Sequence, residues 1–308
     1  MKYLTYTILL FSMIFEGVHA STIEQEILTL PITTISGETV NLAHYKGDRP
    51  IYLKFWATWC QPCRKQMPHF QSIEEEYGDK IKIIAVNLGV NEDINLVKAT
   101  KKEFGLTMPI VIDTSGKLAQ AFNLIGTPYH VLIDKTGNIV HKGHKVSREL
   151  DKKIQLLSSN ESTDLPDITL STGPDTQGII KASSKKTTAL FFVATWCDWY
   201  LKDSRPAMSK NCVNAQNAVN TLYQKFPQYN WTGIVSRLWT GAKELEKYRK
   251  KYNILHSLTI DTSNKAFFDY EVKDFPTLVL VKNGKEVLRI NKFNNEKELS
   301  NKLKMLNL

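Results

Sequence analysis

The feature of this sequence that most constrains its fold is a repeated segment in which only one copy keeps both cysteines. The first copy reads ATWCQPC over residues 57–63, and the second reads ATWCDWY over residues 194–200. A further pair of matching segments, IDTSGK from residue 112 and IDTSNK from residue 260, follows at an offset of 148 residues. A repeat unit of this length corresponds to a whole domain rather than to a turn of a solenoid, so the sequence predicts two homologous domains.

The hydrophobic pattern of each half alternates short apolar strands with helical segments. Residues 51–56 read as a strand that runs into the first cysteine motif. A helix is predicted from near Cys60 to about Tyr77, with a kink at Pro68. In the second half, residues 277–290 surround an Asn-Gly turn and predict a hairpin. The predicted fold class is α/β, with two domains that each have a central mixed β-sheet flanked by helices.

The N-terminus has the pattern of a signal peptide. Lys2 precedes an apolar run over residues 3–15, and small residues lead up to Ala20. The run is shorter than the roughly 20 residues that a helix needs to span a bilayer, although a retained membrane anchor is the alternative. We therefore expect residues 1–20 to be removed after Ala20. Export predicts a periplasmic location, where disulfides can persist.

The remaining chain divides at a short polar segment. We predict a catalytic domain over residues 21–157, a linker over 158–165 and a second domain over 166–308. The net charge is +9, and most of the basic excess lies in the second half. This excess indicates either a solvated surface or a docking face for an acidic partner. The basic residues are scattered and no nucleic-acid-binding module is recognisable, so we expect no nucleic-acid partner.

The first motif has the residues that disulfide exchange requires, which are one attacking thiolate and one resolving thiol. Cys60 lies at the predicted start of a helix, where the helix dipole favours a thiolate, and is the candidate nucleophile. Cys63 lies one turn further in, is expected to be more buried, and is the candidate resolving cysteine. The alternatives are a structural disulfide, or a soft-metal site that also uses Met67 and His69.

Three segments of the first half form a recognisable combination, namely FWATWCQPC at 55–63, VNLGV at 86–90 and GTP at 126–128. With them, the first half resembles the TlpA/ResA branch of periplasmic thiol-disulfide oxidoreductases over roughly residues 25–155, and the second half resembles the same fold with a degenerate active site. The resemblance implies two thioredoxin folds and an enzyme whose redox-active Cys60–Cys63 disulfide needs no other cofactor.

The resemblance also implies partners. The expected activity is the reduction or reshuffling of disulfides in exported client proteins, such as an apocytochrome c or a protein with mis-paired cysteines. Electrons would come from a membrane thiol transporter of the DsbD type. A binding protein is the alternative, in which the cysteines carry Cu(I) or the two domains dock a client without redox turnover.

Three residues are implied to bind the substrate. Trp59 precedes the nucleophile, and Pro128 matches the family's cis-proline, which lies opposite the cysteine pair and presents backbone to a substrate strand. Thr127 would then face the nucleophile. A trans proline in an ordinary turn is the alternative for Pro128.

Two further residues are possible modulators of the site. Lys54 occupies the position at which thioredoxin has a buried aspartate. If its side chain points inward, its amine could help to deprotonate Cys63; if outward, it is a surface residue. Glu92 corresponds either to a glutamate that some relatives place near the site or to an exposed loop carboxylate. We favour the interpretation as an exposed loop carboxylate.

In the second half, Tyr200 takes the place of the resolving cysteine. The remaining cysteines, Cys197 and Cys212, would be roughly 22 Å apart on a straight helix, whereas a disulfide needs Cα atoms within about 7 Å. The chain must therefore turn back if they pair, and Pro206 offers a break, with the extra residues of this repeat expected around 208–214. We predict a mainly structural disulfide, with a free Cys197 as the alternative, and a domain that binds clients or partners.

Overall fold

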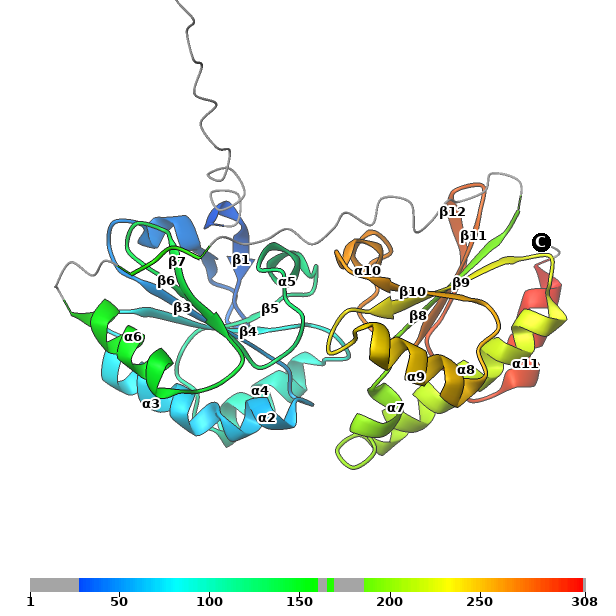
Figure 1. Cartoon of the computed structure of the whole chain (residues 1–308), viewed down its shortest axis with the longest axis horizontal. Helices are drawn as coiled ribbons and strands as arrows, with labels where there is room; N and C mark the ends of the chain where they lie inside the picture. Colours follow the sequence, from blue (N-terminus) through cyan, green and yellow to red (C-terminus); the bar gives the residue numbers. More distant parts are fainter. Residues whose placement is uncertain (1–27, 160–164, 169–185, 307–308) are drawn as a thin grey trace, which may run out of the picture.

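The computed structural model describes residues 28–159, 165–168 and 186–306. The predicted signal peptide lies outside the described residues, as does most of the predicted linker. Two lobes lie side by side in Figure 1, the first coloured blue to green and the second yellow-green to red, and each is built on its own β-sheet.

The first lobe has a five-stranded mixed sheet of order β5-β4-β3-β6-β7. Strands β3, β4 and β5 are parallel, whereas β6 and β7 run antiparallel to their neighbours. A hairpin of β1 (Pro31–Thr33) and β2 (Thr39–Asn41) precedes this sheet. The sheet strands are β3 (Ile51–Trp56), β4 (Lys82–Asn87), β5 (Ile110–Ile112), β6 (Tyr129–Ile133) and β7 (Ile139–Gly143).

The predicted single helix after Cys60 is in fact two helices. α2 (Gln61–Lys65) ends at Gln66, and α3 (Met67–Tyr77) begins at the next residue with Pro68 in its first turn. A proline there lacks only an N–H that has no partner within the helix, so Pro68 starts a new helix instead of kinking an old one. The other helical segments are η1 (Leu42–Tyr45), α4 (Ile94–Glu103), α5 (Lys117–Ala121) and α6 (Arg148–Ser158).

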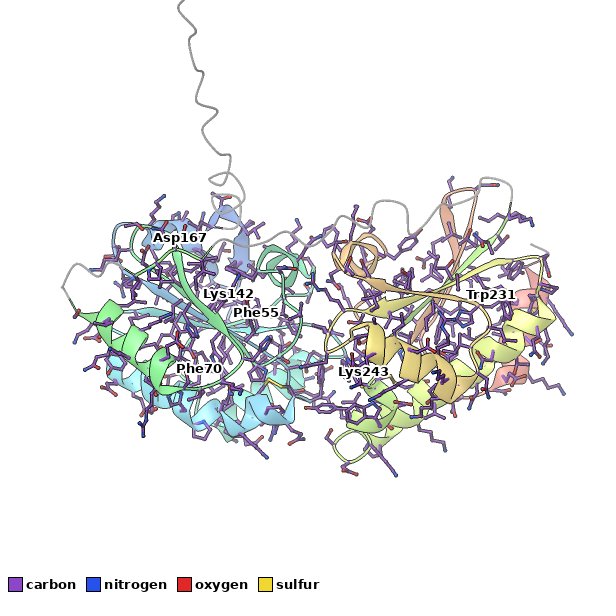
Figure 2. All side chains as sticks on the ribbon, in the orientation of Figure 1. Phe55, Phe70, Lys142, Asp167, Trp231 and Lys243 are labelled. Atoms are coloured by element: carbon purple, nitrogen blue, oxygen red, sulfur yellow. A yellow bond between two sulfur atoms is a disulfide. The ribbon has the colours of Figure 1, made fainter. Side chains whose placement is uncertain are left out.

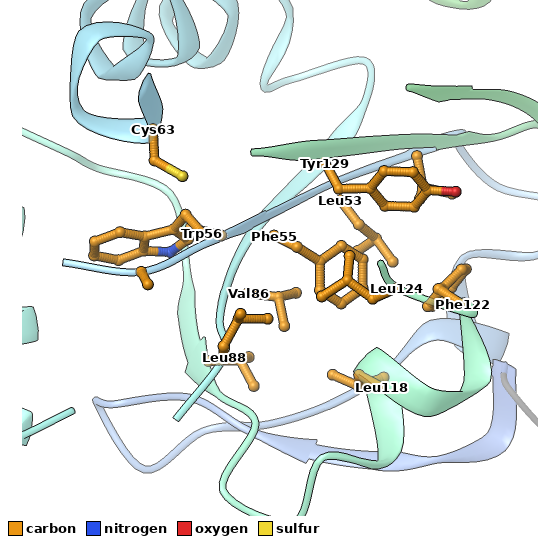
Figure 3. Packing of buried hydrophobic residues seen from close by; sticks show 14 of the residues in the cluster. Leu53, Phe55, Trp56, Cys63, Val86, Leu88, Leu118, Phe122, Leu124 and Tyr129 are labelled. Atoms are coloured by element: carbon orange, nitrogen blue, oxygen red, sulfur yellow. The ribbon is translucent and has the colours of Figure 1, made fainter. Parts of the chain in front are cut away.

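Alternation along β3 divides its side chains between the two faces of the sheet. Tyr52 contacts the ring of Phe70 on α3 edge-on, at 5.3 Å between centroids, whereas Phe55 packs against Phe122 on the opposite face. Figure 3 shows this second cluster, with Cys63 at its edge. All six residues of β3 are buried, so the strand that leads into the cysteine motif lies in the middle of the core.

The second lobe repeats the same topology, with a sheet of order β10-β9-β8-β11-β12. The predicted hairpin is confirmed, and Asn283 and Gly284 at its turn both have positive φ. The strands are β8 (Thr188–Val193), β9 (Asn230–Ser236), β10 (Ser257–Asp261), β11 (Thr277–Lys282) and β12 (Lys285–Ile290), and the helices are α7 (Cys197–Tyr200), α8 (Pro206–Lys225), α9 (Ala242–Tyr252), α10 (Lys265–Asp269) and α11 (Glu296–Met305). The fold class predicted from sequence is confirmed.

The chain turns back between Cys197 and Cys212, as their pairing requires. The turn lies before Pro206 and does not involve residues 208–214. Turns over residues 201–204 separate α7 from α8, and Pro206 begins α8 rather than ending a helix. Residues 208–214 are helical, so the insertion lengthens α8 relative to its counterpart α3.

The segment after α6 stays with the first lobe. Ile168 donates its backbone N–H to the carbonyl oxygen of Ile139 on β7, at 2.7 Å. Leu165 and Ile168 also pack against the larger of the two buried hydrophobic clusters, which includes Ile139 and Val140 of β7 and extends into the second lobe. The predicted start of the second domain at residue 166 is therefore too early.

Equivalent surfaces of the two repeats face each other across the interface. The N–H of Asn91 donates to the carbonyl of Lys273 at 2.8 Å, and the N–H of Trp239 donates to the carbonyl of Ile125 at 2.8 Å. Asn91 and Trp239 are equivalent at the repeat offset of 148, and so are Ile125 and Lys273. The lobes are thus related by a pseudo-two-fold axis, as two subunits are in an isologous dimer.

Candidate redox site

The cysteine pair lies where β3 ends and α2 begins. Cys60 is the N-cap residue of α2, and its Sγ accepts a hydrogen bond from the N–H of Cys63 at 3.2 Å. The two cysteines form a disulfide with 5.2 Å between their Cα atoms. When the pair is reduced, the same N–H and the helix dipole stabilise negative charge on the Cys60 sulfur.

Among the predicted substrate-binding residues, Trp59 directly precedes Cys60, and Thr127 lines a pocket together with Pro62. The Thr127–Pro128 peptide is cis, as predicted. The Pro128 carbonyl lies 2.8 Å from Nδ1 of His144, and Trp59 donates its indole N–H to the carbonyl of Val90 at 2.9 Å. Thr127 is buried, and its Oγ1 has no hydrogen-bond partner among the described residues.

The second lobe covers the redox pair. Cys60 was expected to be the more accessible cysteine, but Cys60 and Cys63 are both 0% exposed. The hydroxyl oxygen of Tyr200 accepts a hydrogen bond from the N–H of Gln61 at 3.0 Å, directly beside Cys60. The ring of Trp59 packs against Trp196 at 5.0 Å between centroids. The residue that replaced the resolving cysteine therefore closes over the first active site.

Glu92 is buried, so the exposed-loop interpretation favoured from sequence is wrong. Its side chain is 1% exposed, and it accepts hydrogen bonds from the Thr58 N–H at 2.5 Å, the Thr58 hydroxyl at 2.7 Å and Asn87 Nδ2 at 3.0 Å. Burial is the largest influence on the Glu92 carboxyl and raises its pKa, and these hydrogen bonds oppose that shift. Arg205 of the second lobe lies 3.9 Å from the carboxylate and also donates to Thr58. Glu92 thus holds the turn before Cys60 in place.

Lys54 points inward and is fully buried. Its ammonium donates to the carbonyl of Gln66 at 3.2 Å and lies 4.9 Å from the centre of the Phe70 ring. Because burial disfavours the charged amine, the pKa of Lys54 is lowered to about 7. Burial, and then the nearby Lys54, lower the pKa of His130 well below its usual range. The amine is therefore suited to exchanging a proton near neutral pH.

Several residues contribute to this site through contacts between the lobes that the sequence did not predict. Asn91 holds both backbone groups of Phe275, since its Oδ1 accepts from the N–H at 2.8 Å and its Nδ2 donates to the carbonyl at 3.1 Å. Arg205 and Tyr200 reach the first lobe from the second. The repeat offset pairs Asn91 with Trp239 and could have marked these two loops as equivalent, but nothing local predicts that they meet.

The alternative of a soft-metal site gains no support from Met67 and His69. Met67 is fully buried, and Nε2 of His69 lies 2.9 Å from a carboxylate oxygen of Asp151 on α6. Within the described ranges, no group of three or more His, Cys, Asp or Glu side chains is arranged to hold a metal ion. None of the helices described here combines the length and apolar composition that a bilayer crossing needs.

The first lobe is similar in sequence to known proteins. Residues 23–142 match the model of the AhpC/TSA family. The thioredoxin-like protein YneN of Bacillus subtilis is 36% identical over 128 residues, which are 41% of this chain and 74% of the relative. The chain belongs to the thioredoxin-like thiol-disulfide oxidoreductases.

Other members of this family give similar matches. The thiol-disulfide oxidoreductase ResA of Bacillus thuringiensis subsp. konkukian is 32% identical over 130 residues, covering 41% of this chain and 73% of the relative. The crystal structure of StoA from Bacillus subtilis is 32% identical, covers 41% of this chain and 95% of that chain, and superposes with a TM-score of 0.37.

We expect Lys54 to give this oxidoreductase a pH-dependent stability. The folded pKa of about 7 lies below the unfolded value of 10.5, so the unfolded chain binds more protons between these values and the free energy of unfolding rises with pH. The expected gain is about 2 kcal/mol between pH 7 and pH 9 for the oxidised protein. Denaturant titrations at several pH values measure it.

Lys54→Met should remove this rise. Lys82→Met, on the neighbouring strand β4, is the matched control and should retain it, because Lys82 lies at the start of that strand and is only partly buried. A Lys54→Met protein with the same pH slope as the wild type would show that the buried amine is not its source.

The second disulfide joins α7 to α8. Cys197 and Cys212 are bonded, as predicted, with 6.1 Å between their Cα atoms and a sequence separation of 15. A loop of this length contributes about 3 kcal/mol by restricting the unfolded chain. We expect the Cys197→Ala/Cys212→Ala variant to lose about that much free energy of unfolding in denaturant titrations. Ser209→Ala, also buried on α8, is the comparison; an equal loss in both variants would contradict a contribution specific to the disulfide.

Proposed function

We propose that this chain is an exported, periplasmic thiol-disulfide oxidoreductase that reduces or reshuffles disulfides in exported client proteins. Family membership supports the disulfide-containing clients. The signal-peptide pattern supports export. The observation that carries the proposed chemistry is the placement of Cys60 as the N-cap of α2, bonded to Cys63 and beside the cis-proline loop.

The catalytic cycle begins with the reduced pair. The Cys60 thiolate attacks one sulfur of the client disulfide, and the other client sulfur leaves as a thiolate. Cys63 then attacks the Cys60 sulfur, which releases the second client thiolate and leaves the Cys60–Cys63 disulfide. Lys54 is proposed to accept the Cys63 proton, since its amine lies beneath this turn and has a pKa of about 7. Two electrons from a membrane thiol transporter of the DsbD type restore the dithiol.

The second domain is proposed to control which clients reach Cys60. Tyr200 and Trp196 cover the turn that carries the nucleophile, so a protein client gains access only when these contacts separate. Asn91 and Arg205 provide polar contacts that hold the lobes together and can be exchanged for water when they open.

The deciding experiment is the reduction potential of Cys60–Cys63, measured by equilibration in thiol buffers with mass-spectrometric readout of each cysteine pair. A value near about −270 mV supports a reductant that needs a dedicated electron supply. A value near about −120 mV would reverse the proposed direction of electron flow. Reduction of insulin separates this function from Cu(I) transport, which does not require it.

A further inference from the structure

A pocket of about 560 Å³ lies beside the redox pair, between the two lobes. Pro62 and Thr127 of the first lobe form one side of it. Pro62 lies between the two active-site cysteines, and Thr127 precedes the cis-proline. The second lobe contributes the rest of the lining, which consists of Thr195, Trp196, Trp199, Tyr200, Trp239, Glu244, Lys247, Tyr248 and Lys251.

The aromatic side chains of this pocket hold one another in place. Trp239 meets Trp196 edge-on at 5.2 Å between centroids and stacks with Tyr200 at 6.3 Å. Trp199 meets Tyr200 edge-on at 5.9 Å, yet its own side chain is 60% exposed. A rigid aromatic surface with an exposed tryptophan at its edge is suited to binding another large apolar group.

Thr127 lines the pocket and is only 2% exposed, and in the described structure its Oγ1 forms no hydrogen bond. A buried hydroxyl without a partner is costly, so this wall of the pocket gains from a rearrangement that brings a partner to it. Among the charged residues of the lining, Lys251 is already paired with Asp198 at 2.6 Å.

We propose that this pocket binds one aromatic side chain of a client polypeptide, within a few residues of the client's reactive cysteine. The aromatic wall of the pocket belongs to the second lobe and lies opposite Pro62, between the two cysteines. A client that reaches Cys60 once Tyr200 and Trp196 separate from the first lobe therefore has its neighbouring residues beside this wall. Tyr200 both lines the pocket and accepts the hydrogen bond of Gln61, so the bound side chain contacts the residue that covers the redox pair. This assignment rests on the proposed function and adds a substrate preference to it.

The test uses the reduced full-length chain and two peptides. Each carries one cysteine in a mixed disulfide with 2-nitro-5-thiobenzoate, and they differ only in a Trp or an Ala two residues from that cysteine. Attack by the Cys60 thiolate forms the peptide–Cys60 disulfide and releases the coloured thiolate, whose appearance gives the rate. We expect the Trp peptide to react at least about tenfold faster.

The Trp199→Ala variant should bring the ratio of the two rates close to one, and Trp199→Phe should keep most of it. Leu255→Ala, which removes another exposed apolar side chain of the second lobe, should leave the ratio unchanged. Equal rates for the two peptides with the wild-type protein, or an unchanged ratio in Trp199→Ala, would overturn the pocket assignment and leave the oxidoreductase function standing. If neither peptide reacts, the proposed function fails and the assignment fails with it.

Discussion

Replacing Cys60 with serine is expected to lower disulfide-reducing activity by at least about 10³-fold. The thiolate is the attacking group in disulfide exchange, and a serine hydroxyl at the same N-cap position cannot form the mixed disulfide. Insulin reduction with a fixed electron donor measures the loss. The effect should be the largest of any single substitution in the chain.

The companion variant Cys63→Ser separates the two roles. It should still attack a client disulfide but fail to release it, so a covalent client–Cys60 adduct should accumulate and be visible by mass spectrometry. The Cys197→Ala/Cys212→Ala protein is the control and should form no such adduct. Loss of activity in that control, with activity retained in Cys60→Ser, would move the redox centre to the second lobe.

Opening of the interface should be the second large effect. In the closed structure the side chain of Asn91 pairs with both the N–H and the C=O of Phe275. Asn91→Gly leaves these two groups buried without partners, at a cost of about 1–3 kcal/mol each, while glycine tolerates the φ of 52° at this position. Because about 1.4 kcal/mol is a tenfold change in an equilibrium, the open population should rise at least about tenfold.

The rate at which a bulky maleimide modifies Cys60 in the reduced protein reports this population. Asn253→Gly is the matched control, since Asn253 has a φ of 50° at the end of α9 and makes the same backbone change away from the first lobe. An equal Cys60 modification rate in wild type and Asn91→Gly would mean that the second lobe does not limit access to the nucleophile.

The pseudo-two-fold arrangement explains why a degenerate second active site would be retained. An isologous interface uses the same surface of both repeats, so a motif that lies at this surface in one repeat also lies at it in the other. In this chain Trp59 meets Trp196, and Tyr200 reaches the residue after Cys60. Tyrosine at the former resolving position contributes a ring to the pocket and a hydroxyl to the first redox centre, which a cysteine could not do together.

Features coded within a short stretch of chain were predicted from the sequence. The strand before the motif, the Cys60–Cys63 pair and the cis form of Pro128 were all confirmed, because each depends on neighbouring residues or on a motif of a few positions. The interruption at Gln66 was missed, because a proline five residues after Cys63 is compatible both with a kinked helix and with a new first turn.

The sequence by itself indicated the repeated fold, the two cysteine pairs and which half holds a complete pair of motif cysteines. Only the tertiary structure decided that Glu92 is buried, that Cys60 is covered, and that an aromatic pocket adjoins it. These depend on pairs such as Gln61 with Tyr200, 139 residues apart, and Thr58 with Arg205, 147 apart. Such contacts form because two complementary surfaces bury apolar area together, and no local pattern records which distant residue will lie opposite.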